Sequence, residues 1–439
     1  MSTANSTVAL ADKPSVKSEC LRVLFVSLTN DVGSERVVGE MAHCGVQCAL
    51  VSPKGFYCAA LAAITRHFPL PAHYGVRFGT LFVRDRLERA AREWRPDLIL
   101  PLDDLSSWLL RCLAVDRKIN PQVRQLLIRS LGPSSGYLAA ISRSEFMNRA
   151  EALGLNKPLH YEVRDHGAAL AAAKQWGYPV VIKTEHTSGG VGVSIARNPN
   201  ELAKRLAAIE AGDRLRKIRQ PIKRWVYRQA GFRTGPRAPT IIQSFVDGVP
   251  AFRTVAAWQG RVLAGASFVA VQVNPEPTGA STVVRHVENS SMNQAVIQMV
   301  SALECSGFVS FDFVVDMESG RASVIEMNPR SLGTTHLGRL FGADICGALV
   351  TVVTGGRAPI VSPQLTTELV ALFPKELERN SDSPYLKSTT VYHDVPVDNP
   401  RLMSIYLRRV KKLNPGIDQS FLTLLGGGPR NQGIEEACG

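Results

Sequence analysis

The sequence predicts a mixed α/β and α+β protein, in which a doubly wound parallel sheet comes first and antiparallel strands follow. In the first part, short continuous apolar runs at residues 21–27, 47–52 and 96–101 alternate with helical stretches. Such runs are typical of strands that are buried on both faces. In the later part, strands flank short turns at residues 259–260 and near Ser319, which predicts antiparallel hairpins.

Length and composition are those of a globular protein with two or three packed domains. The chain has 439 residues, of which 45% are hydrophobic and 20% charged. Because no apolar run approaches the roughly 18 residues that a membrane span needs, we expect no membrane-spanning helix. The first 19 residues lack a hydrophobic signal core and are expected to form a disordered tail. Eight scattered cysteines predict reduced thiols and a cytoplasmic protein rather than a disulfide framework.

The net charge of +13 is concentrated in one segment. Residues 204–237 contain eleven basic and two acidic residues, with Trp225, Tyr227 and Phe232 interleaved. Two interpretations stay open for this segment: a solvated basic helix and loop, or a surface that binds a polyanion, an anionic carrier protein or a membrane surface. Nucleic acid is not an expected partner.

A metal site is predicted on the hairpin between residues 307 and 330. If its turn centres on Ser319, Asp312 lies opposite Glu326 and Ser310 opposite Asn328. The period of two then places Asp312, Glu326 and Asn328 on one face, and turns apolar neighbours such as Phe311 to the other. Facing carboxylates repel each other unless a cation lies between them, and these hard oxygen ligands suit Mg²⁺. A solvated hairpin face or an ion pair is the alternative.

A second pattern predicts phosphate binding. A β-branched strand ends in Lys183, and a turn rich in serine and glycine separates it from the next strand. Glycines let backbone N–H groups approach anionic oxygens, and the lysine supplies a point charge. The residues predicted to hold phosphate in this turn are Ser188, Gly189, Gly190 and Gly192. An ordinary turn is the alternative reading.

In the chain the glycine-rich turn precedes the metal hairpin. Together and in that order, the two patterns resemble the ATP-grasp superfamily, and in particular its carboxylate–amine ligases and the large subunit of carbamoyl-phosphate synthase. The resemblance is strongest over residues 135–355 and most specific in the sequence that runs from Glu326 to Arg330. It implies ATP and Mg²⁺, with Mn²⁺ as a possible substitute, as cofactors. It also implies a hinge strand whose backbone reads adenine, formed by Gln243, Ser244, Phe245 and Val246.

The resemblance further implies a domain order. A Rossmann-like domain precedes the two-lobed ATP-grasp fold, and a C-terminal α/β extension follows it. The implied boundaries are 20–134 for the first domain, 135–243 for the small lobe with its basic insertion, 244–357 for the large lobe, and 358–439 for the extension and tail.

Two positions depart from the pattern of the superfamily. Arg143 stands where relatives usually place a lysine that helps to hold phosphate, and we expect it to replace that lysine. An arginine cannot reposition itself as a lysine would. Ser244 stands where a hinge glutamate is common, and the sequence identifies no acidic partner for ribose.

The resemblance implies a ligase that activates a small carboxylate as an acyl phosphate for attack by an amine. Arg330 would take the substrate carboxylate in a bidentate fork, Arg285 would steady the acyl phosphate, and Lys183 would hold phosphate oxygens. His286 and His336 are expected to pack or cap rather than act as bases. A homodimer is common among relatives. A catalytically silent ATP-binding protein and a polyanion-binding module are the competing functions.

Overall fold

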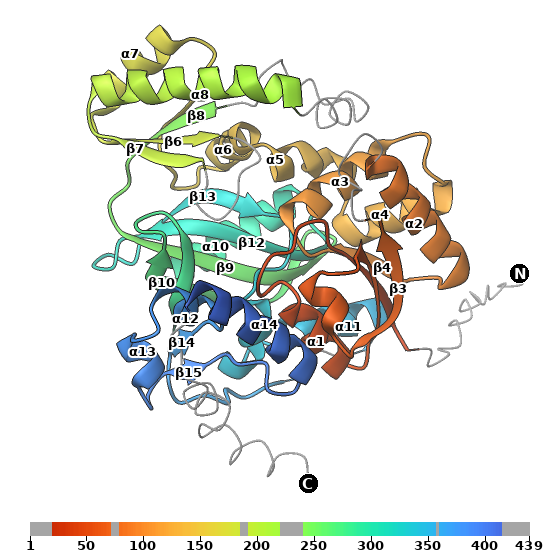
Figure 1. Cartoon of the computed structure of the whole chain (residues 1–439). Coiled ribbons are helices and arrows are strands. Elements are labelled where there is room, and N and C mark those ends of the chain that lie inside the picture. The colour runs from red at the N-terminus through yellow and green to blue at the C-terminus, as the bar shows by residue number, and fades with distance from the viewer. Residues whose placement is uncertain (1–19, 72–78, 185–191, 220–239, 357–359, 415–439) are drawn as a thin grey trace, which may run out of the picture.

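The computed structural model describes residues 20–71, 79–184, 192–219, 240–356 and 360–414, which form three sheets with their covering helices (Figure 1). Several predictions fall outside these residues. They are the tail at 1–19, most of the glycine-rich turn including Ser188, Gly189 and Gly190, residues 220–237 of the basic segment, and residues 415–439.

The first sheet is parallel and buried on both faces. Its strands are β1 (Arg22–Val26), β2 (Gln47–Pro53), β3 (Ile64–Leu70) and β4 (Leu98–Pro101), in the order β3-β2-β1-β4. Val23 and Phe25 pack into one core and Leu24 and Val26 into another, which explains the continuous apolar run. The helices of this part are α1 (Arg36–His43), η1 (Tyr57–Ala60), α2 (Gly79–Glu93), α3 (Asp104–Val115) and α4 (Pro121–Leu131).

The second sheet forms a small antiparallel lobe at the top of Figure 1. It contains β5 (His160–Glu162), β6 (Val180–Thr184), β7 (Val193–Ala196) and β8 (Thr240–Ser244), in the order β5-β8-β6-β7. Two helices, α7 (His166–Trp176) and α8 (Pro199–Arg219), pack their apolar residues on it, among them Ala169 and Leu202 on Val180 and Ile182. Helix α7 ends at Gly177, whose φ of +86° suits glycine.

The third sheet is the largest, and it extends beyond the predicted large lobe. Its order is β13-β12-β9-β10-β11-β14-β15. The bounds are β9 (Val249–Trp258), β10 (Arg261–Asn274), β11 (Ala280–Val287), β12 (Gly307–Val315), β13 (Ala322–Asn328), β14 (Leu369–Ala371) and β15 (Tyr392–His393). The turn at Gln259–Gly260 is confirmed. Since β14 pairs with β11, the sheet crosses the boundary predicted at 357/358.

Helices cover both faces of this sheet. On one face lie α10 (Ser290–Ala302) and, before it in the chain, η2 (Ser134–Gly136), α5 (Tyr137–Ile141) and α6 (Arg143–Ala152). On the other lie η3 (Thr335–Phe341) and α11 (Ile345–Thr354). The short helices α12 (Lys375–Arg379) and α13 (Pro384–Lys387) and a longer helix, α14 (Pro400–Leu413), complete the described part of the chain.

The position of α6 differs from the prediction, which assigned it to the small lobe. Phe146, Met147 and Ala150 of α6 share a core with Phe311 and other residues of the large sheet. Its N-terminus therefore has a fixed position relative to β12 and β13, while the residues that follow it lead into the small lobe.

A break in the helical structure separates η3 from α11. Gly342 adopts a left-handed conformation with φ of +85°, which ends η3 and separates it from α11. Asp344 then caps α11 by accepting a hydrogen bond from the Gly347 N–H at 2.7 Å.

The first unit of the chain is joined to α14 by a buried polar contact. The Tyr406 hydroxyl of α14 donates to the Glu35 carboxylate, and the Gly33 N–H donates to Glu35 at 3.0 Å. Glu35 and Tyr406 are both fully buried, and burial raises the pKa of Glu35. The loop after β1 also packs closely on the segment after β13. A Cβ atom added to Gly33 would lie only 3.3 Å from the Cα of Gly333.

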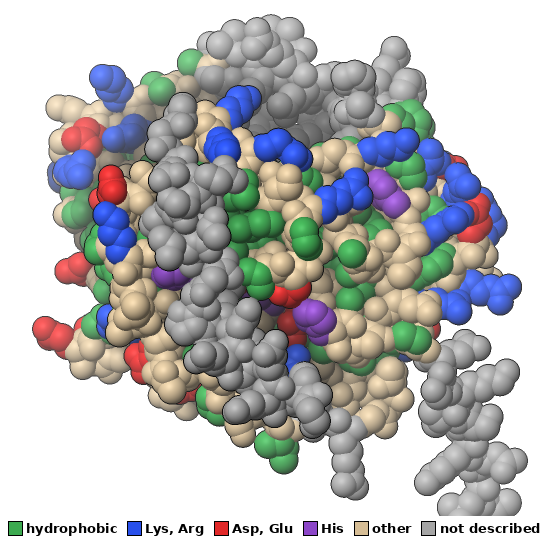
Figure 2. Space-filling model, turned by 60° about the horizontal axis from the view of Figure 1, so that its bottom comes forward, with side chains coloured by type: hydrophobic (Ala, Val, Ile, Leu, Met, Phe, Trp, Pro, Cys, Tyr) green, Lys and Arg blue, Asp and Glu red, His purple; other side chains and the backbone are tan. Residues whose placement is uncertain are grey.

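No single helix among the described residues is long and apolar enough to cross a membrane; only the pair η3 and α11, bent by 99°, has the required length and composition when taken together. The seven cysteines of the described ranges are all free thiols, as predicted. On the face shown in Figure 2, Lys and Arg side chains lie at several places between hydrophobic side chains.

We expect Tyr406→Phe to lower the free energy of unfolding by about 1–3 kcal/mol, because Glu35 then loses a buried donor. Tyr161→Phe, in the small lobe, is the control, since no hydrogen bond is recorded for its hydroxyl among the described residues. Denaturant titration measures both. Equal stability of the two variants would show that the Glu35–Tyr406 contact contributes nothing.

Candidate active site

The predicted pairing of the metal hairpin is confirmed. In the antiparallel pair of β12 and β13, Asp312 lies opposite Glu326 and Ser310 opposite Asn328. Phe311, Phe313 and Met327 are buried on the other face, as expected. Ile325, which was expected to join them, is only half-buried, because the register shifts between Asp312 and Phe313. This shift leaves Ile325 without a partner residue on β12, which makes it the extra residue of a β-bulge.

The three predicted metal ligands lie together. The Asn328 amide Nδ2 donates to Asp312 Oδ2 at 3.1 Å, and Glu326 faces Asp312 across the hairpin. Burial, followed by the charge of Glu326, raises the pKa of Asp312 to about 7. Two carboxylates and an amide are a donor set of hard oxygen ligands, and they would fit Mg²⁺.

Two cationic side chains from other elements, Lys183 and Arg143, lie beside this carboxylate pair. Lys183, at the end of β6, is 5% exposed, and its Nζ donates to the Ile325 carbonyl at 3.5 Å. The bulge therefore provides an acceptor for the lysine. Burial lowers the pKa of Lys183, although the charges of Glu326 and Asp312 act in the opposite direction.

Arg143 lies at the N-terminus of α6 and bridges the two lobes. Its Nη2 donates to Glu326 Oε1 at 2.6 Å, and its Nη1 donates to the Thr184 carbonyl at 2.8 Å. The Ser142 side chain caps α6 by accepting from the Glu145 N–H, which fixes where the helix begins. The sequence predicted Arg143 as a nucleotide contact; its ion pair with a predicted metal ligand was not foreseen.

Arg330 has a protein partner that the sequence did not identify. Its Nε and Nη2 donate to Asp104 Oδ1 and Oδ2 at 2.5 and 2.9 Å, and its Nη1 donates to the Ser331 carbonyl at 3.1 Å. Burial disfavours the charged forms of Arg330 and Asp104, but the attraction between the two charges outweighs this effect. The pKa of Arg330 is therefore raised and the pKa of Asp104 lowered. The sequence places Asp103 and Asp104 beyond the end of a strand of the parallel sheet, where ligands of such sheets sit, with an ordinary turn or helix cap as the alternative.

Asp103 and Asp104 have different roles. Asp103 is buried and caps α3, with Oδ1 accepting from the Ser106 N–H at 2.8 Å and Oδ2 from the Leu28 N–H at 2.6 Å. Burial raises its pKa to about 6. Asp104 is partly exposed and points to Arg330, which ties the first unit of the chain to the end of β13.

Arg285 was expected beside the acyl phosphate, and the structure does not place it there. Asp312 lies opposite Phe252, Phe252 opposite Phe268, and Phe268 opposite His286, with no register shift between these pairs. Residues that are opposite each other share a face, so His286 is on the face of Asp312 and Arg285 is on the other. Arg285 is exposed there, and this prediction is wrong.

The hinge residues lie next to β6. Gln243 pairs with Val181, and Ser244 pairs with Val180 and accepts from the Leu159 N–H through its hydroxyl at 2.9 Å. Gln243 Nε2 is buried, and no acceptor is recorded for it among the described residues. Phe245 is 42% exposed and Val246 half-buried. Gly192, the described end of the glycine-rich turn, has φ of +80° and accepts from the Thr184 N–H at 3.1 Å.

The two histidines have packing and pairing contacts, as expected. His286 stacks on Phe341 with ring centroids 4.3 Å apart. His336 Nε2 lies 3.0 Å from Asp394 Oδ1, which also accepts from Arg36 at 2.7 Å. Neither histidine forms a hydrogen bond with the carboxylate pair of the hairpin.

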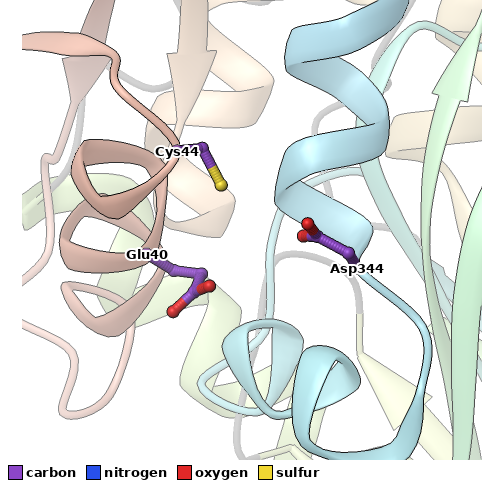
Figure 3. A group of neighbouring side chains, drawn as sticks. All are labelled: Glu40, Cys44 and Asp344. Carbon is purple, nitrogen blue, oxygen red and sulfur yellow. The ribbon is translucent and has the colours of Figure 1, made fainter. Parts of the chain in front are cut away.

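A second group of potential metal ligands lies elsewhere, between α1 and α11. Figure 3 shows Glu40 of α1, Cys44 directly after α1 and Asp344 before α11 near one another, and their ligand atoms lie within 4.8 Å of one another. Protein groups already serve two of them: Arg339 lies 3.5 Å from Glu40, and Asp344 caps α11. Burial, then Asp344 and Glu40, raises the pKa of Cys44 to about 12, which disfavours a thiolate. These contacts explain the group as helix packing.

Comparisons with known proteins agree with the fold. The family model "Carbamoyl-phosphate synthase L chain, ATP binding domain" matches residues 142–213. The carbamoyl phosphate synthase large chain, N-terminal section, of Methanopyrus kandleri is 25% identical over 296 residues, which are 65% of this chain and 48% of that protein. The chain thus spans about half the length of this relative, and 25% of the Thermotoga sp. (strain RQ2) large chain.

Solved structures share the architecture. The biotin carboxylase domain dimer of Hydrogenobacter thermophilus 2-oxoglutarate carboxylase, in complex with MgADP, ADP and bicarbonate, has a TM-score of 0.55 at 15% identity, covering 77% of this chain and 71% of that one. An L-amino acid ligase from Bacillus licheniformis has a TM-score of 0.52 at 16% identity, covering 79% and 77%. The family model, the similarity to carbamoyl phosphate synthase large chains and the shared architecture together support an ATP-grasp superfamily protein.

Proposed function

We propose that the protein is an ATP- and Mg²⁺-dependent ligase that activates a small carboxylate as an acyl phosphate for attack by an amine. One observation carries the proposal: the carboxylates of Asp312 and Glu326 face each other within reach of two cations from other elements, Lys183 and Arg143. Phosphoryl transfer needs positioning and charge neutralisation of this kind more than covalent help from the protein.

In this proposal Asp312, Glu326 and Asn328 hold the metal ion, Mg²⁺ or Mn²⁺. The ion, when bound, would neutralise charge on the phosphate oxygens. Lys183 and the turn from Ser188 to Gly192 would hold those oxygens on the side of the small lobe. The hinge, Gln243 to Val246, would hold adenine, and the buried Gln243 Nε2 donor supports a polar ligand there.

Arg330 would bind the substrate carboxylate while Asp104 holds it in place. A guanidinium has five N–H donors, and the contacts with Asp104 and Ser331 use three of them. The two that remain are on Nη1 and Nη2, so that a carboxylate can still be bound. Arg285 has no part in this proposal because it lies on the other face of the sheet.

The chemistry then needs two balanced steps. A carboxylate oxygen of the substrate forms a bond to the γ-phosphorus as the bond to ADP breaks, which gives an acyl phosphate. The amine nitrogen then bonds to the acyl carbon, phosphate leaves, and the nitrogen loses a proton. The buried positions of Lys183 and Arg143 would limit the access of water to the acyl phosphate.

The relatives support this class of reaction without identifying the substrates. Carbamoyl phosphate synthase, biotin carboxylase and L-amino acid ligase are the names of these relatives. The dimer in the biotin carboxylase structure supports a homodimer as a further proposal. A catalytically silent ATP-binding protein is the alternative, and it predicts nucleotide binding without ADP release.

We expect Glu326→Gln to abolish ADP release in a coupled assay with MgATP and a panel of carboxylates and amines, because one charge of the metal site is lost. Glu318→Gln, at the exposed turn of the same hairpin, is the matched control and should turn over normally. Normal turnover of Glu326→Gln, with unchanged melting temperature, would contradict the metal assignment.

We expect Asp104→Asn to raise KM for the carboxylate substrate about tenfold, since the charge that orients Arg330 is lost. KM for ATP should change by less than about twofold, because Asp104 is not in the proposed nucleotide site. Steady-state kinetics with each substrate varied in turn separates the two effects, and Asp116→Asn, after the other end of α3, is the control. Equal increases in both KM values would assign Asp104 a general structural role.

A further inference from the structure

The centre of the proposed site contains a balanced set of charges. Asp312 and Glu326 supply two carboxyl groups, and Lys183 and Arg143 supply two cations. Arg143 is 9% exposed and Lys183 5% exposed, so water screens these charges poorly. A divalent cation that enters alone would therefore add two positive charges to a site that is already neutral when all four groups are ionised.

Arg143 is the cation that contacts a predicted metal ligand directly. Its Nη2 lies 2.6 Å from Glu326 Oε1, whereas among the described residues Lys183 Nζ donates to the Ile325 carbonyl alone, at 3.5 Å. A metal ion bound to Glu326 and the guanidinium at this distance would repel each other strongly. Contact of Arg143 with Glu326 and occupation of Glu326 by a metal ion thus oppose each other.

The same arginine is placed to exchange one anionic partner for another. Its second contact is to the carbonyl of Thr184, the last residue of β6, immediately before the glycine-rich turn. A planar guanidinium can donate to phosphate oxygens with the same fork of N–H groups that it offers to a carboxylate. Since α6 is packed on the large sheet, the exchange needs only a side-chain movement.

We propose that Arg143 is a specificity-determining residue that competes with a divalent cation for Glu326, so that the site accepts the metal with nucleotide phosphates and discriminates against the metal alone. The proposal rests on the metal and nucleotide sites of the proposed function. Bound phosphate draws Arg143 from Glu326, releases that carboxylate to the metal ion and supplies the negative charge that the ion requires.

The test measures Mn²⁺ binding and MgADP binding by the full chain in separate titrations, by electron paramagnetic resonance and calorimetry respectively. In Arg143→Gln we expect Mn²⁺ alone to bind about tenfold more tightly than in the wild type, and MgADP to bind about tenfold more weakly. Arg149→Gln, an exposed position on the same helix, is the matched control and should change neither affinity.

The opposite signs distinguish this role from a structural one, because a damaged site would bind both ligands less well. Mn²⁺ affinity that is unchanged or reduced in a folded Arg143→Gln would overturn the proposal. Should that variant not fold, Arg143→Lys decides: its single nitrogen cannot hold Glu326 and the Thr184 carbonyl together as the guanidinium does, so Mn²⁺ alone should bind more tightly than in the wild type and MgADP more weakly. Unchanged or weaker Mn²⁺ binding by Arg143→Lys would count against the competition.

Failure of the underlying site would look different. If wild type bound neither Mn²⁺ nor MgADP, or if Glu326→Gln bound Mn²⁺ as the wild type does, the proposed metal site itself would be wrong. If MgADP binding required Glu326 but Mn²⁺ binding did not respond to Arg143, only the competition would be wrong.

Discussion

The repulsion between two carboxylates that a hairpin holds face to face is the constraint on which the rest of the site depends. Pairing in β12 and β13 gives Asp312 and Glu326 no way to separate, and burial makes their charges costly. Groups from the surrounding elements compensate the two negative charges. The bulge at Ile325, the last residues of β6 and the first residue of α6 all place polar or cationic groups beside the pair.

The same need for charge compensation joins parts of the chain that are far apart in sequence. Arg143 bridges the small lobe and the large sheet, while Arg330 holds Asp104 of the first unit in a bidentate contact. Neither pair needs to add much net stability, because buried ion pairs often only balance their own desolvation. Their importance is geometric: each fixes the position of a group that the proposed reaction requires.

Local patterns predicted the fold and the hairpin well, because strand periodicity and turn position depend on neighbouring residues. The pairing of Asp312 with Glu326 followed from one turn at Ser319. The bulge at Ile325 has no signal in residue type and could not be predicted. The face on which Arg285 lies depends on the register of three strand pairs, from β12 through β9 and β10 to β11. A local pattern does not contain these registers, so the side of the sheet could not be predicted for Arg285. Arg330 and its partner Asp104 are 226 residues apart in the sequence, and Arg143 and Glu326 are 183 residues apart, so no local pattern could predict these contacts.

The contact between Tyr406 and Glu35 spans 371 residues and has a consequence for biosynthesis. The parallel sheet of the first unit leaves the ribosome long before α14 is translated. Until then the Glu35 carboxyl group lacks the tyrosine hydroxyl that donates to it, so we expect this corner of the first unit to stay open to water until α14 packs against it. The packing of the first unit is therefore completed only after α14 has been made.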